Sequence, residues 1–499
     1  MKLPLRLTLG LASAALTHAS FAAHAQEAWQ AHGALKVSTD GHRIAHADNT
    51  PFLWIGDTAW GLFQQLKREE VDAYLDNRKA LGFTVVQAVI HWYPHGGGLP
   101  TGPSNAADAY GFRPFAGSDS APDPARPAVT PGGSPQAPND YWDNADYVVE
   151  AVRKRGMYLA LLPTWGRATV AGQFGESSTI FNEDRARAYG EFLGARYRNQ
   201  PHIIWVLGGD VKAQIDGYDK NQAPASFDKR PVFRAMAEGI GAGVTGRKLA
   251  WNRPDGWDAL FMTYHPDGDP LDNSSKWFHA DAWLDANGVE VWREVDQVYP
   301  VMLGDYGLKS PVKPSLFLEG SYEFGSYRNG CGSVTPVMVR RQAYHTFFAG
   351  GAGHTYGAGP IWAMRGTGGD YNCGYTWKQA LAFPAANQFA TIARKFLERY
   401  DWARWIPDGR MINGVGEKAS LKTGVVTSDG KRALVYFSDG SATRVRNRLS
   451  GKVEARWFDP RSGEESAAGT FGEGEERSML PPDRWEDAVL ILEATPSPK

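Results

Sequence analysis

The feature that most constrains the fold is a regular alternation of short apolar runs with longer amphipathic segments, from residue 52 to residue 356. The longer segments, such as 68–81 and 184–197, carry apolar residues at helical spacing and acidic residues near their starts. Repeated strand–helix units build a parallel sheet, and eight of them close into a barrel. We therefore predict an α/β fold, a (β/α)8 TIM barrel over residues 26–400, with strands near residues 52–55, 84–90, 157–162, 203–207, 260–264, 288–292, 315–318 and 350–356.

Beyond Tyr400 the pattern changes to short β-type runs separated by turn sequences such as Ser428-Asp429-Gly430. We expect a small β-sandwich over residues 401–495, joined to the barrel by a helical segment at 377–399. Its predicted strands lie near residues 424–426, 433–437, 453–458 and 488–492.

One interruption of the barrel pattern is far longer than an ordinary barrel loop. Residues 94–139 are rich in Pro, Gly, Ser and Ala. A connection of this length predicts a lid or a rim beside the barrel.

The N-terminus has the three parts of a secretory signal. Lys2 and Arg6 are basic, residues 7–16 form a short apolar core, and Ala23-His24-Ala25 fits an A-x-A cleavage site. We expect residues 1–25 to be removed and the mature chain to be exported, to the periplasm or outside the cell. No later stretch approaches the roughly 20 apolar residues that span a bilayer, so no membrane attachment is expected.

Charge and cysteine content narrow the expected partners. Lys and Arg number 53 against 55 Asp and Glu, so no basic field exists to attract nucleic acid. Cys331 and Cys373 are the only cysteines, and in an oxidising compartment a disulfide is favoured over a metal site. The 18 Trp and 20 Tyr suit either a sugar-binding cleft or a large barrel core.

The active site of such a barrel lies at the C-terminal ends of its strands, so residues at or just after each apolar run are candidates. Trp60, Glu323 and Tyr356 lie close to these positions and are added as expected substrate contacts. The residues at the strand ends themselves are Asp57, Gln87, His91, Trp165, Asp210, His265, Glu319 and His354.

Two carboxyl groups at these ends suit the cleavage of a sugar linkage. Asp210 follows a buried strand and two glycines, and Glu319 ends the seventh run. Cleavage of a glycosidic bond needs one carboxyl group to protonate the leaving oxygen and another to attack the sugar or to activate water. By analogy with retaining barrels, Asp210 after strand four is the acid/base and Glu319 after strand seven the nucleophile. Glu323 is the rival to Glu319.

Structural roles compete with these functional ones. Asp57 fits an N-cap of the next helix as well as a substrate contact. His265 and His354 suit either hydrogen bonds to sugar oxygens or a structural role. No usual zinc spacing, serine nucleophile elbow or phosphate-binding glycine loop occurs, so no metal and no cofactor are expected.

Several short motifs resemble glycoside hydrolase family 140, the apiosidase-like barrels, and they occur in the same order across the barrel. The C-terminal part, with Trp457-Phe458-Asp459-Pro460 and Pro481-Pro482-Asp483, looks like the β-sandwich that is often appended there and carries a collagen-binding label. The barrel motifs are Trp54-Ile55-Gly56-Asp57-Thr58-Ala59-Trp60, Gly82-Phe83-Thr84-Val85-Val86-Gln87-Ala88, Leu161-Leu162-Pro163-Thr164-Trp165-Gly166, the strand ending in Gly208-Gly209-Asp210, and Gly353-His354-Thr355-Tyr356-Gly357.

The resemblance implies an enzyme that removes D-apiose from plant pectin, with Asp210 and Glu319 at the family's catalytic positions. The family often has the motif Asp-Gly-Glu-Pro-x-Tyr-Glu. At that position this chain has Phe317-Leu318-Glu319-Gly320-Ser321-Tyr322-Glu323. The substrate is therefore less determined than the reaction. Other readings are a different furanosidase, an endo-acting glycanase, or a glycan-binding protein without catalysis.

Overall fold

The computed structural model describes residues 27–92, 105–170, 179–218, 224–268, 272–291, 295–325, 330–364, 373–417 and 420–495. The expected signal segment, residues 1–25, lies outside these ranges, as do residues 94–104 of the long interruption.

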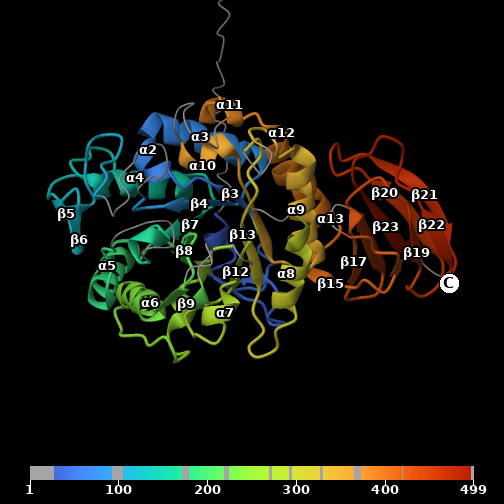
Figure 1. Cartoon of the computed structure of the whole chain (residues 1–499), viewed down its shortest axis with the longest axis horizontal. Coiled ribbons are helices and arrows are strands. Elements are labelled where there is room, and N and C mark those ends of the chain that lie inside the picture. Colours follow the sequence, from blue (N-terminus) through green and yellow to red (C-terminus); the bar gives the residue numbers. More distant parts are fainter. Residues whose placement is uncertain are drawn as a thin grey trace, which may run out of the picture.

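Eight parallel strands form the barrel, in the order β11-β8-β7-β4-β3-β14-β13-β12 (Figure 1). A parallel bridge between Thr263 and Ala286 connects the two outermost strands, and the Thr263 hydroxyl donates to the Ala286 carbonyl at 2.8 Å. The predicted barrel is thus confirmed, and each predicted run overlaps a strand. The strands are β3 (Trp54–Thr58), β4 (Val85–Val89), β7 (Tyr158–Leu162), β8 (Ile203–Gly208), β11 (Met262–His265), β12 (Asn287–Val291), β13 (Ser315–Gly320) and β14 (Gly353–Tyr356).

Alternate residues of each strand face opposite sides of the barrel wall. Trp54, Val85, Ile204 and Leu316 belong to one apolar cluster, which fills the barrel interior. Their strand neighbours, such as Ile55, belong to a second cluster between the sheet and the surrounding helices. This division decides which side chains at the strand ends face the centre of the barrel.

Helices follow the strands and surround the sheet (Figure 1). Local signals set their ends: the Asp140 side chain accepts from the backbone N–H groups of Trp142 and Asp143 at the start of α4, and Gly82 ends α3 in a left-handed conformation. The helices are α1 (Ala28–Ala31), α2 (Leu62–Gln65), α3 (Arg68–Leu81), α4 (Tyr141–Lys154), α5 (Glu183–Arg196), α6 (Arg230–Thr245), α7 (Ser275–Phe278), α8 (Val298–Tyr306), α9 (Pro336–Phe348), α10 (Gly359–Ala363), α11 (Trp377–Ala380), α12 (Pro384–Asn387) and α13 (Arg394–Arg399).

Three short antiparallel pairs decorate the barrel: β1 (Leu35–Val37) with β2 (Ile44–His46), β5 (Phe115–Ser118) with β6 (Ala121–Pro127), and β9 (Gln214–Tyr218) with β10 (Pro224–Asp228). The pair β5–β6 comes from the long interruption and lies at the edge of the barrel beside α4 and α5 (Figure 1).

The C-terminal part is a sandwich of two antiparallel sheets, as predicted. Buried Met411, Val445, Trp457 and Phe471 belong to the apolar core between them. One sheet contains β15 (Trp405–Pro407), β17 (Lys422–Thr427), β18 (Arg432–Phe437), β23 (Ala488–Ala494), β20 (Val453–Phe458) and β21 (Glu465–Phe471); the other contains β16 (Ile412–Asn413), β19 (Thr443–Arg446) and β22 (Glu476–Met479).

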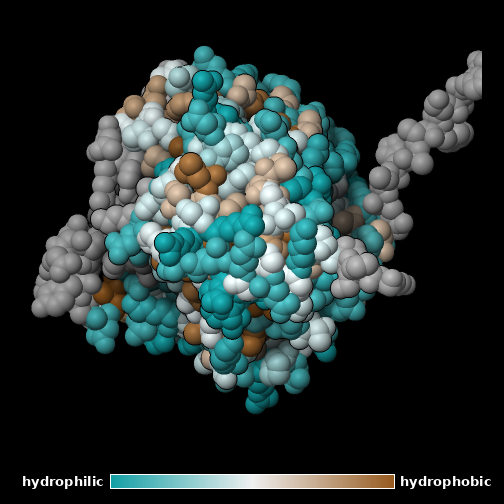
Figure 2. Space-filling model, turned by 90° about the vertical axis from the view of Figure 1, so that its right-hand side faces the viewer, coloured by the Kyte–Doolittle hydropathy of each residue, from teal (hydrophilic) through white to brown (hydrophobic). Residues whose placement is uncertain are grey.

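Helix α9 of the barrel packs against this sandwich. Arg340 on α9 pairs with Asp487 at 2.7 Å, and both side chains are buried. Figure 2 looks onto the sandwich end of the molecule, where hydrophilic side chains cover most of the visible face and hydrophobic ones form small separate groups. No helix within the described ranges combines the length and the apolar character that crossing a membrane requires.

A disulfide joins Cys331 and Cys373, whose Cα atoms lie 5.2 Å apart. It connects the segment between β13 and α9 to the segment between α10 and α11.

Candidate active site

Asp210 reaches the rim of the barrel through a turn that only glycines permit. Gly208, Gly209 and Asp210 have φ of 87°, 109° and 51°. A Cβ on Gly208 would lie 2.2 Å from the carbonyl oxygen of His265, and one on Gly209 would lie 2.8 Å from the Trp165 ring. A quarter of the Asp210 side chain (25%) stays exposed, so a ligand can reach it.

Glu319 is aimed by an irregularity in its strand. Val289 of β12 pairs with Phe317, but the next residue, Glu290, pairs with Glu319, which leaves Leu318 as an extra residue on β13. A bulge of this kind redirects the side chain that follows it. Glu319 therefore faces the barrel axis, whereas Phe317 packs outward against α8.

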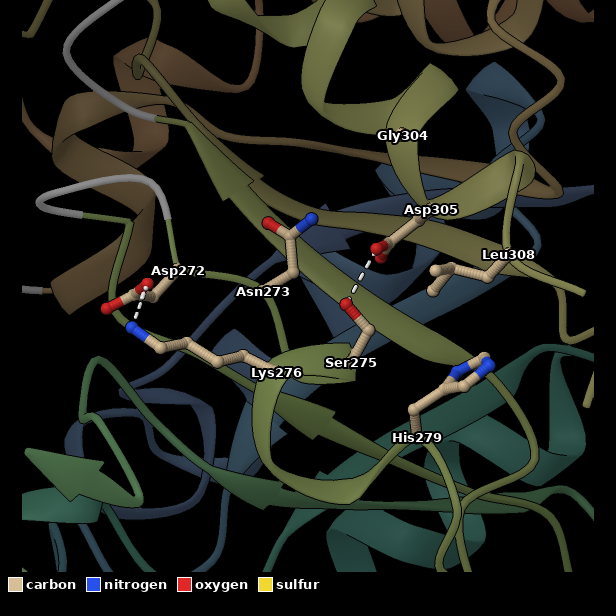
Figure 3. A pocket seen from close by; sticks show the side chains of 8 residues that line it. All are labelled: Asp272, Asn273, Ser275, Lys276, His279, Gly304, Asp305 and Leu308. Atoms are coloured by element: carbon tan, nitrogen blue, oxygen red, sulfur yellow. Dashed lines mark hydrogen bonds and ion pairs between the residues drawn. The ribbon is translucent and has the colours of Figure 1, made fainter. Parts of the chain in front are cut away.

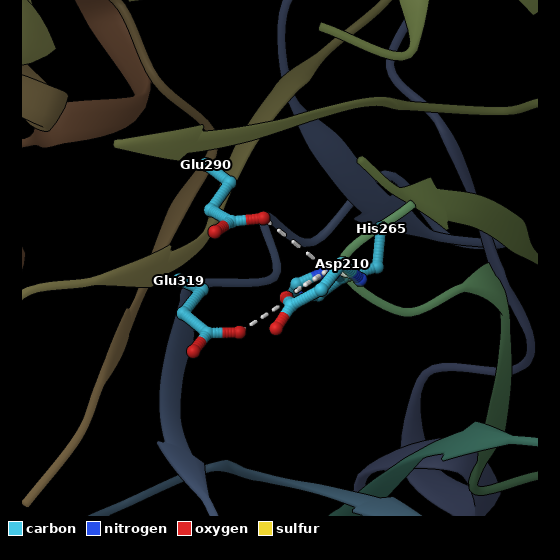
Figure 4. A group of neighbouring side chains, drawn as sticks. All are labelled: Asp210, His265, Glu290 and Glu319. Atoms are coloured by element: carbon cyan, nitrogen blue, oxygen red, sulfur yellow. Dashed lines mark hydrogen bonds and ion pairs between the residues drawn. The ribbon is translucent and has the colours of Figure 1, made fainter. Parts of the chain in front are cut away.

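His265 and Glu290 complete a cluster with these two carboxyl groups (Figure 4). His265 Nε2 lies 3.0 Å from Glu319 Oε2, and Nδ1 lies 3.7 Å from Asp210 Oδ1 and 3.8 Å from Glu290 Oε2. One side-chain oxygen or nitrogen from each of the four residues lies within 4.8 Å of those of the others.

Aromatic side chains enclose the cluster. Trp60 Nε1 donates to the Tyr322 hydroxyl at 3.1 Å, and that hydroxyl donates to Glu319 Oε1. The Trp60 ring lies 4.9 Å from the Trp165 ring and 5.3 Å from the His265 ring, measured between centroids. Glu319, beside these rings, has only 7% of its side chain exposed.

The carboxyl groups of the cluster have raised pKa values. Burial, followed by the negative charge of Glu319, raises the pKa of Asp210 to about 8. Burial raises the pKa of Glu319 to about 7, although hydrogen bonds from Tyr322 and Asp210 oppose the rise. Asp210 thus keeps a proton to higher pH than Glu319 and donates it in the hydrogen bond between them. Burial also lowers the pKa of His265, so its ring is neutral at pH 7.

Of the residues expected from the sequence, Asp210, Glu319, His265, Trp60 and Trp165 meet in this cluster. Two others lie close by. Gln87 Nε2 donates to the carbonyl oxygen of Leu318 at 3.0 Å, directly before Glu319, and His91 Nδ1 lies 3.0 Å from the Thr164 hydroxyl.

Asp57 does not join the cluster. Its carboxylate accepts from Arg78 Nε at 2.7 Å and from the Tyr74 hydroxyl at 2.6 Å, both on α3. Asp57 shares the outward face of β3 with Ile55, so it faces the helix layer. It also makes no N-cap contact, since the helix that follows starts at Leu62.

Three further candidates also lie outside the barrel wall. His354 packs flat on Phe317, with ring centroids 4.6 Å apart, and its Nδ1 lies 3.0 Å from the Thr346 hydroxyl on α9. Glu323, the rival nucleophile, accepts from the Tyr356 hydroxyl at 2.6 Å and from the Ala385 N–H at 3.0 Å. Glu323 and Tyr356 therefore bind each other instead of facing Asp210.

Two members of the site, Glu290 and Tyr322, were not predicted. Glu290 lies inside the sixth apolar run, 288–292, so a search for residues after each run passes over it. The alternation of residues along that strand, which places Glu290 on the inward face, is the sequence signal that could have identified it. Tyr322 carries no such signal, because it reaches Glu319 through a loop after β13.

The four residues of the cluster also have the donor atoms of a divalent metal site. Three carboxyl groups and one imidazole within 4.8 Å match ligands that such ions accept. The expectation from the sequence that the protein binds no metal stays a prediction.

A pocket of about 400 Å³ opens elsewhere, between α7 and α8 (Figure 3). Ser275 donates to Asp305 at 2.6 Å across it, and Lys276 donates to Asp272 at 2.7 Å. None of its lining residues belongs to the carboxyl cluster. They are Asp272, Asn273, Ser275, Lys276, His279, Gly304, Asp305 and Leu308.

The cluster is suited to displacement at a sugar carbon. One carboxyl group that keeps its proton faces a second that loses it more easily, and their closest oxygens lie within 4.8 Å. Carboxyl groups about 5–5.5 Å apart are typical of retention, whereas about 6.5–9.5 Å leaves room for the water of an inverting enzyme.

Solved structures resemble this fold along most of its length. A structure titled "Glycoside hydrolase" has a TM-score of 0.76 and 26% identity, and the match covers 94% of this chain and 98% of that one. A structure titled as a glycoside hydrolase family 5 protein from Bacteroides vulgatus has a TM-score of 0.74 and 26% identity, with 93% and 94% covered. A third from Bacteroides vulgatus, titled a glycoside hydrolase, shares the fold at 11% identity and a TM-score of 0.57, with 93% and 83% covered. A comparison with curated proteins found no match.

Family comparison covers both parts of the chain. The model described as "Apiosidase-like, catalytic domain" matches residues 38–404, and the one described as "Putative collagen-binding domain of a collagenase" matches residues 406–493. The first match spans the whole barrel, including the carboxyl cluster. The chain therefore belongs to the apiosidase-like family and is a glycoside hydrolase.

Proposed function

We propose that this glycoside hydrolase removes β-D-apiose, a furanose sugar, from plant cell-wall pectin with retention of configuration. Asp210 is the acid/base and Glu319 the nucleophile. One observation carries the assignment of roles: Asp210 and Glu319 face each other from the ends of β8 and β13, and the Asp210 side chain is 25% exposed whereas that of Glu319 is 7% exposed. The family description supports apiose as the sugar.

The reaction has two displacements. Asp210 gives its proton to the glycosidic oxygen while Glu319 attacks the anomeric carbon, so the bond to the leaving group breaks and a sugar ester forms on Glu319. Asp210, now ionised, takes a proton from water, and the resulting hydroxide cleaves the ester. The sugar leaves with its original configuration, and both carboxyl groups return to their starting states.

Surrounding residues favour this cycle. The Tyr322 hydroxyl stabilises the ionised form of Glu319 by hydrogen bonding to Oε1. The neutral ring of His265, 3.0 Å from Glu319 Oε2, adds no competing charge. Asp210 is the partly exposed member of the pair. This exposure suits the acid/base, which must reach the leaving oxygen and then a water molecule.

We also infer that the enzyme works after export. The basic start, apolar core and A-x-A site of residues 1–25 support a cleaved signal, and the Cys331–Cys373 disulfide suits an oxidising compartment. Sequencing the N-terminus of protein recovered from the producing cells tests this. A mature chain that starts near Gln26 is expected, whereas a chain that retains residues 1–25 contradicts it.

Incubation with a panel of plant and bacterial glycans, including rhamnogalacturonan II side chains, tests the substrate. We expect released D-apiose as the only new monosaccharide, detected by chromatography and mass spectrometry. The matched controls are Asp210→Asn and Glu319→Gln, which keep side-chain size. Release of a different sugar, or of oligosaccharides alone, contradicts the apiose assignment.

A further inference from the structure

Glu290 is a third carboxyl group inside the cluster, and the two-carboxylate reaction gives it no task. It lies on the inward face of β12, next to Glu319 in the strand pairing, and is only 1% exposed. Its Oε2 lies 3.8 Å from His265 Nδ1, and one of its carboxyl oxygens lies within 4.8 Å of a carboxyl oxygen of Asp210 and of Glu319. Placing a carboxyl group there is costly, which calls for an explanation.

One carboxyl oxygen of Glu290 accepts a hydrogen bond from the described part of the protein, and the other does not. The Gly268 N–H donates to the carboxyl group. Among the residues that the structure describes, none gives Oε2 a hydrogen bond, although this atom is fully shielded from solvent. Buried polar atoms without a partner are uncommon in folded proteins. Because Oε2 lies 3.8 Å from His265 Nδ1, in the same cluster as Asp210 and Glu319, a ligand bound at the cluster is the partner that would satisfy it.

The carboxyl group of Glu290 can hydrogen-bond to a hydroxyl group of a ligand. Burial, then the negative charges of Asp210, Glu319 and Asp267, raises its pKa well above the ordinary value. A carboxyl group accepts hydrogen bonds when it is ionised, and it also offers one O–H donor when it is protonated. A sugar hydroxyl both donates and accepts, so it can pair with Oε2 in either state.

Geometry selects the hydroxyl. In the proposed reaction Glu319 meets the anomeric carbon and Asp210 meets the leaving oxygen. Glu290 has a carboxyl oxygen within 4.8 Å of both of these groups. Of the hydroxyls on the sugar ring, the one on the carbon next to the anomeric carbon is nearest to the bond that they cleave. A hydrogen bond to the hydroxyl on that carbon strengthens in the transition state of glycosidases.

We propose that Glu290 contacts the substrate directly and forms a hydrogen bond through Oε2 with the 2-hydroxyl of the sugar held between Asp210 and Glu319. This role rests on the proposed function. It makes Glu290 a specificity residue for sugars that carry a hydroxyl at this position.

The test compares two substrates, 4-nitrophenyl β-D-apiofuranoside and its 2-deoxy counterpart, with the wild type, Glu290→Ala and Glu290→Gln. Loss of the hydrogen bond in Glu290→Ala should lower kcat/KM about 30-fold or more on the hydroxylated substrate and less than about three-fold on the deoxy substrate. Glu290→Gln should restore part of the loss, because its amide both donates and accepts hydrogen bonds at this position. Glu323→Gln, a buried carboxyl group outside the cluster, is the matched control and should affect both substrates equally.

The outcomes separate the two proposals. If the wild type cleaves both substrates and Glu290→Ala loses the same factor on each, the contact with the 2-hydroxyl is overturned while the hydrolase assignment stands. If the wild type cleaves neither apioside, the apiose assignment fails, and the role of Glu290 on that sugar fails with it.

Discussion

The hydroxyl of Tyr322 donates a hydrogen bond to Oε1 of Glu319, from a position three residues further along the chain. This bond favours the ionised carboxylate, the form that attacks a sugar carbon. Tyr322→Phe should therefore raise the pKa of Glu319 and move the acidic limb of the kcat/KM profile to higher pH, with a loss in kcat on the order of 10-fold. Tyr375→Phe, at an exposed ring, is the control. An unchanged pH profile in Tyr322→Phe would show that the bond does not tune Glu319.

The pH dependence of the wild type follows from the two raised pKa values. Glu319 must lose its proton, so kcat/KM should rise as the pH increases through about 7. Asp210 must keep its proton, so kcat/KM should fall above about 8. We expect a narrow bell with its maximum between these values, measured with an aryl glycoside. A maximum near pH 4 would mean that neither carboxyl group has the raised pKa that burial gives it here.

Glu323 makes structural hydrogen bonds and Glu319 is the proposed nucleophile, so mutations of the two residues should affect stability and turnover differently. Glu323→Gln disturbs the bonds to Tyr356 and Ala385, so the free energy of unfolding should fall by about 1–3 kcal/mol while kcat is largely kept. Glu319→Gln should lower kcat on the order of 10³-fold or more with an unchanged or higher Tm, because a crowded buried charge is removed. Denaturant unfolding and turnover are measured on the same preparations. The reverse pattern would make Glu323 the nucleophile.

Asp57 belongs to a buried ion pair with Arg78, and both side chains are fully shielded. Removing one partner of such a pair costs about 3–5 kcal/mol. Arg78→Met should therefore lower the free energy of unfolding by about that amount and leave KM nearly unchanged at a temperature where the variant is folded. A large rise in KM without loss of stability would restore Asp57 to substrate binding.

The barrel could be predicted because its signals are local. Each strand is a short apolar run, and strand order alone places Asp210 and Glu319 at separate strands of the same rim, from which they face each other across the barrel. The side of the wall that a residue faces was harder to predict. Asp57 and His354 lie on barrel strands as expected, yet both face the helices, because adjacent strand residues alternate between the two sides.

The geometry of the carboxyl cluster depends on details that a linear pattern does not carry. The extra residue Leu318 redirects Glu319, and no feature of the run 315–318 marks it. Glu290 was missed because it lies inside the sixth apolar run, whereas the candidates were sought at the ends of the runs. Tyr322, in the loop after β13, contacts Glu319 on that strand and Trp60 in the segment after β3, so only the fold shows these contacts.

The central claim is that Glu319 forms a covalent bond to the sugar while Asp210 serves as acid and base. The direct measurement uses Asp210→Asn with a 2,4-dinitrophenyl β-D-apiofuranoside, whose leaving group needs no acid. Formation of the ester should then proceed, but its hydrolysis lacks a base, so the sugar ester should accumulate. Peptide mapping by mass spectrometry should place the added sugar on Glu319. A sugar on Glu290 or Glu323, or rapid turnover with no adduct, would contradict the account.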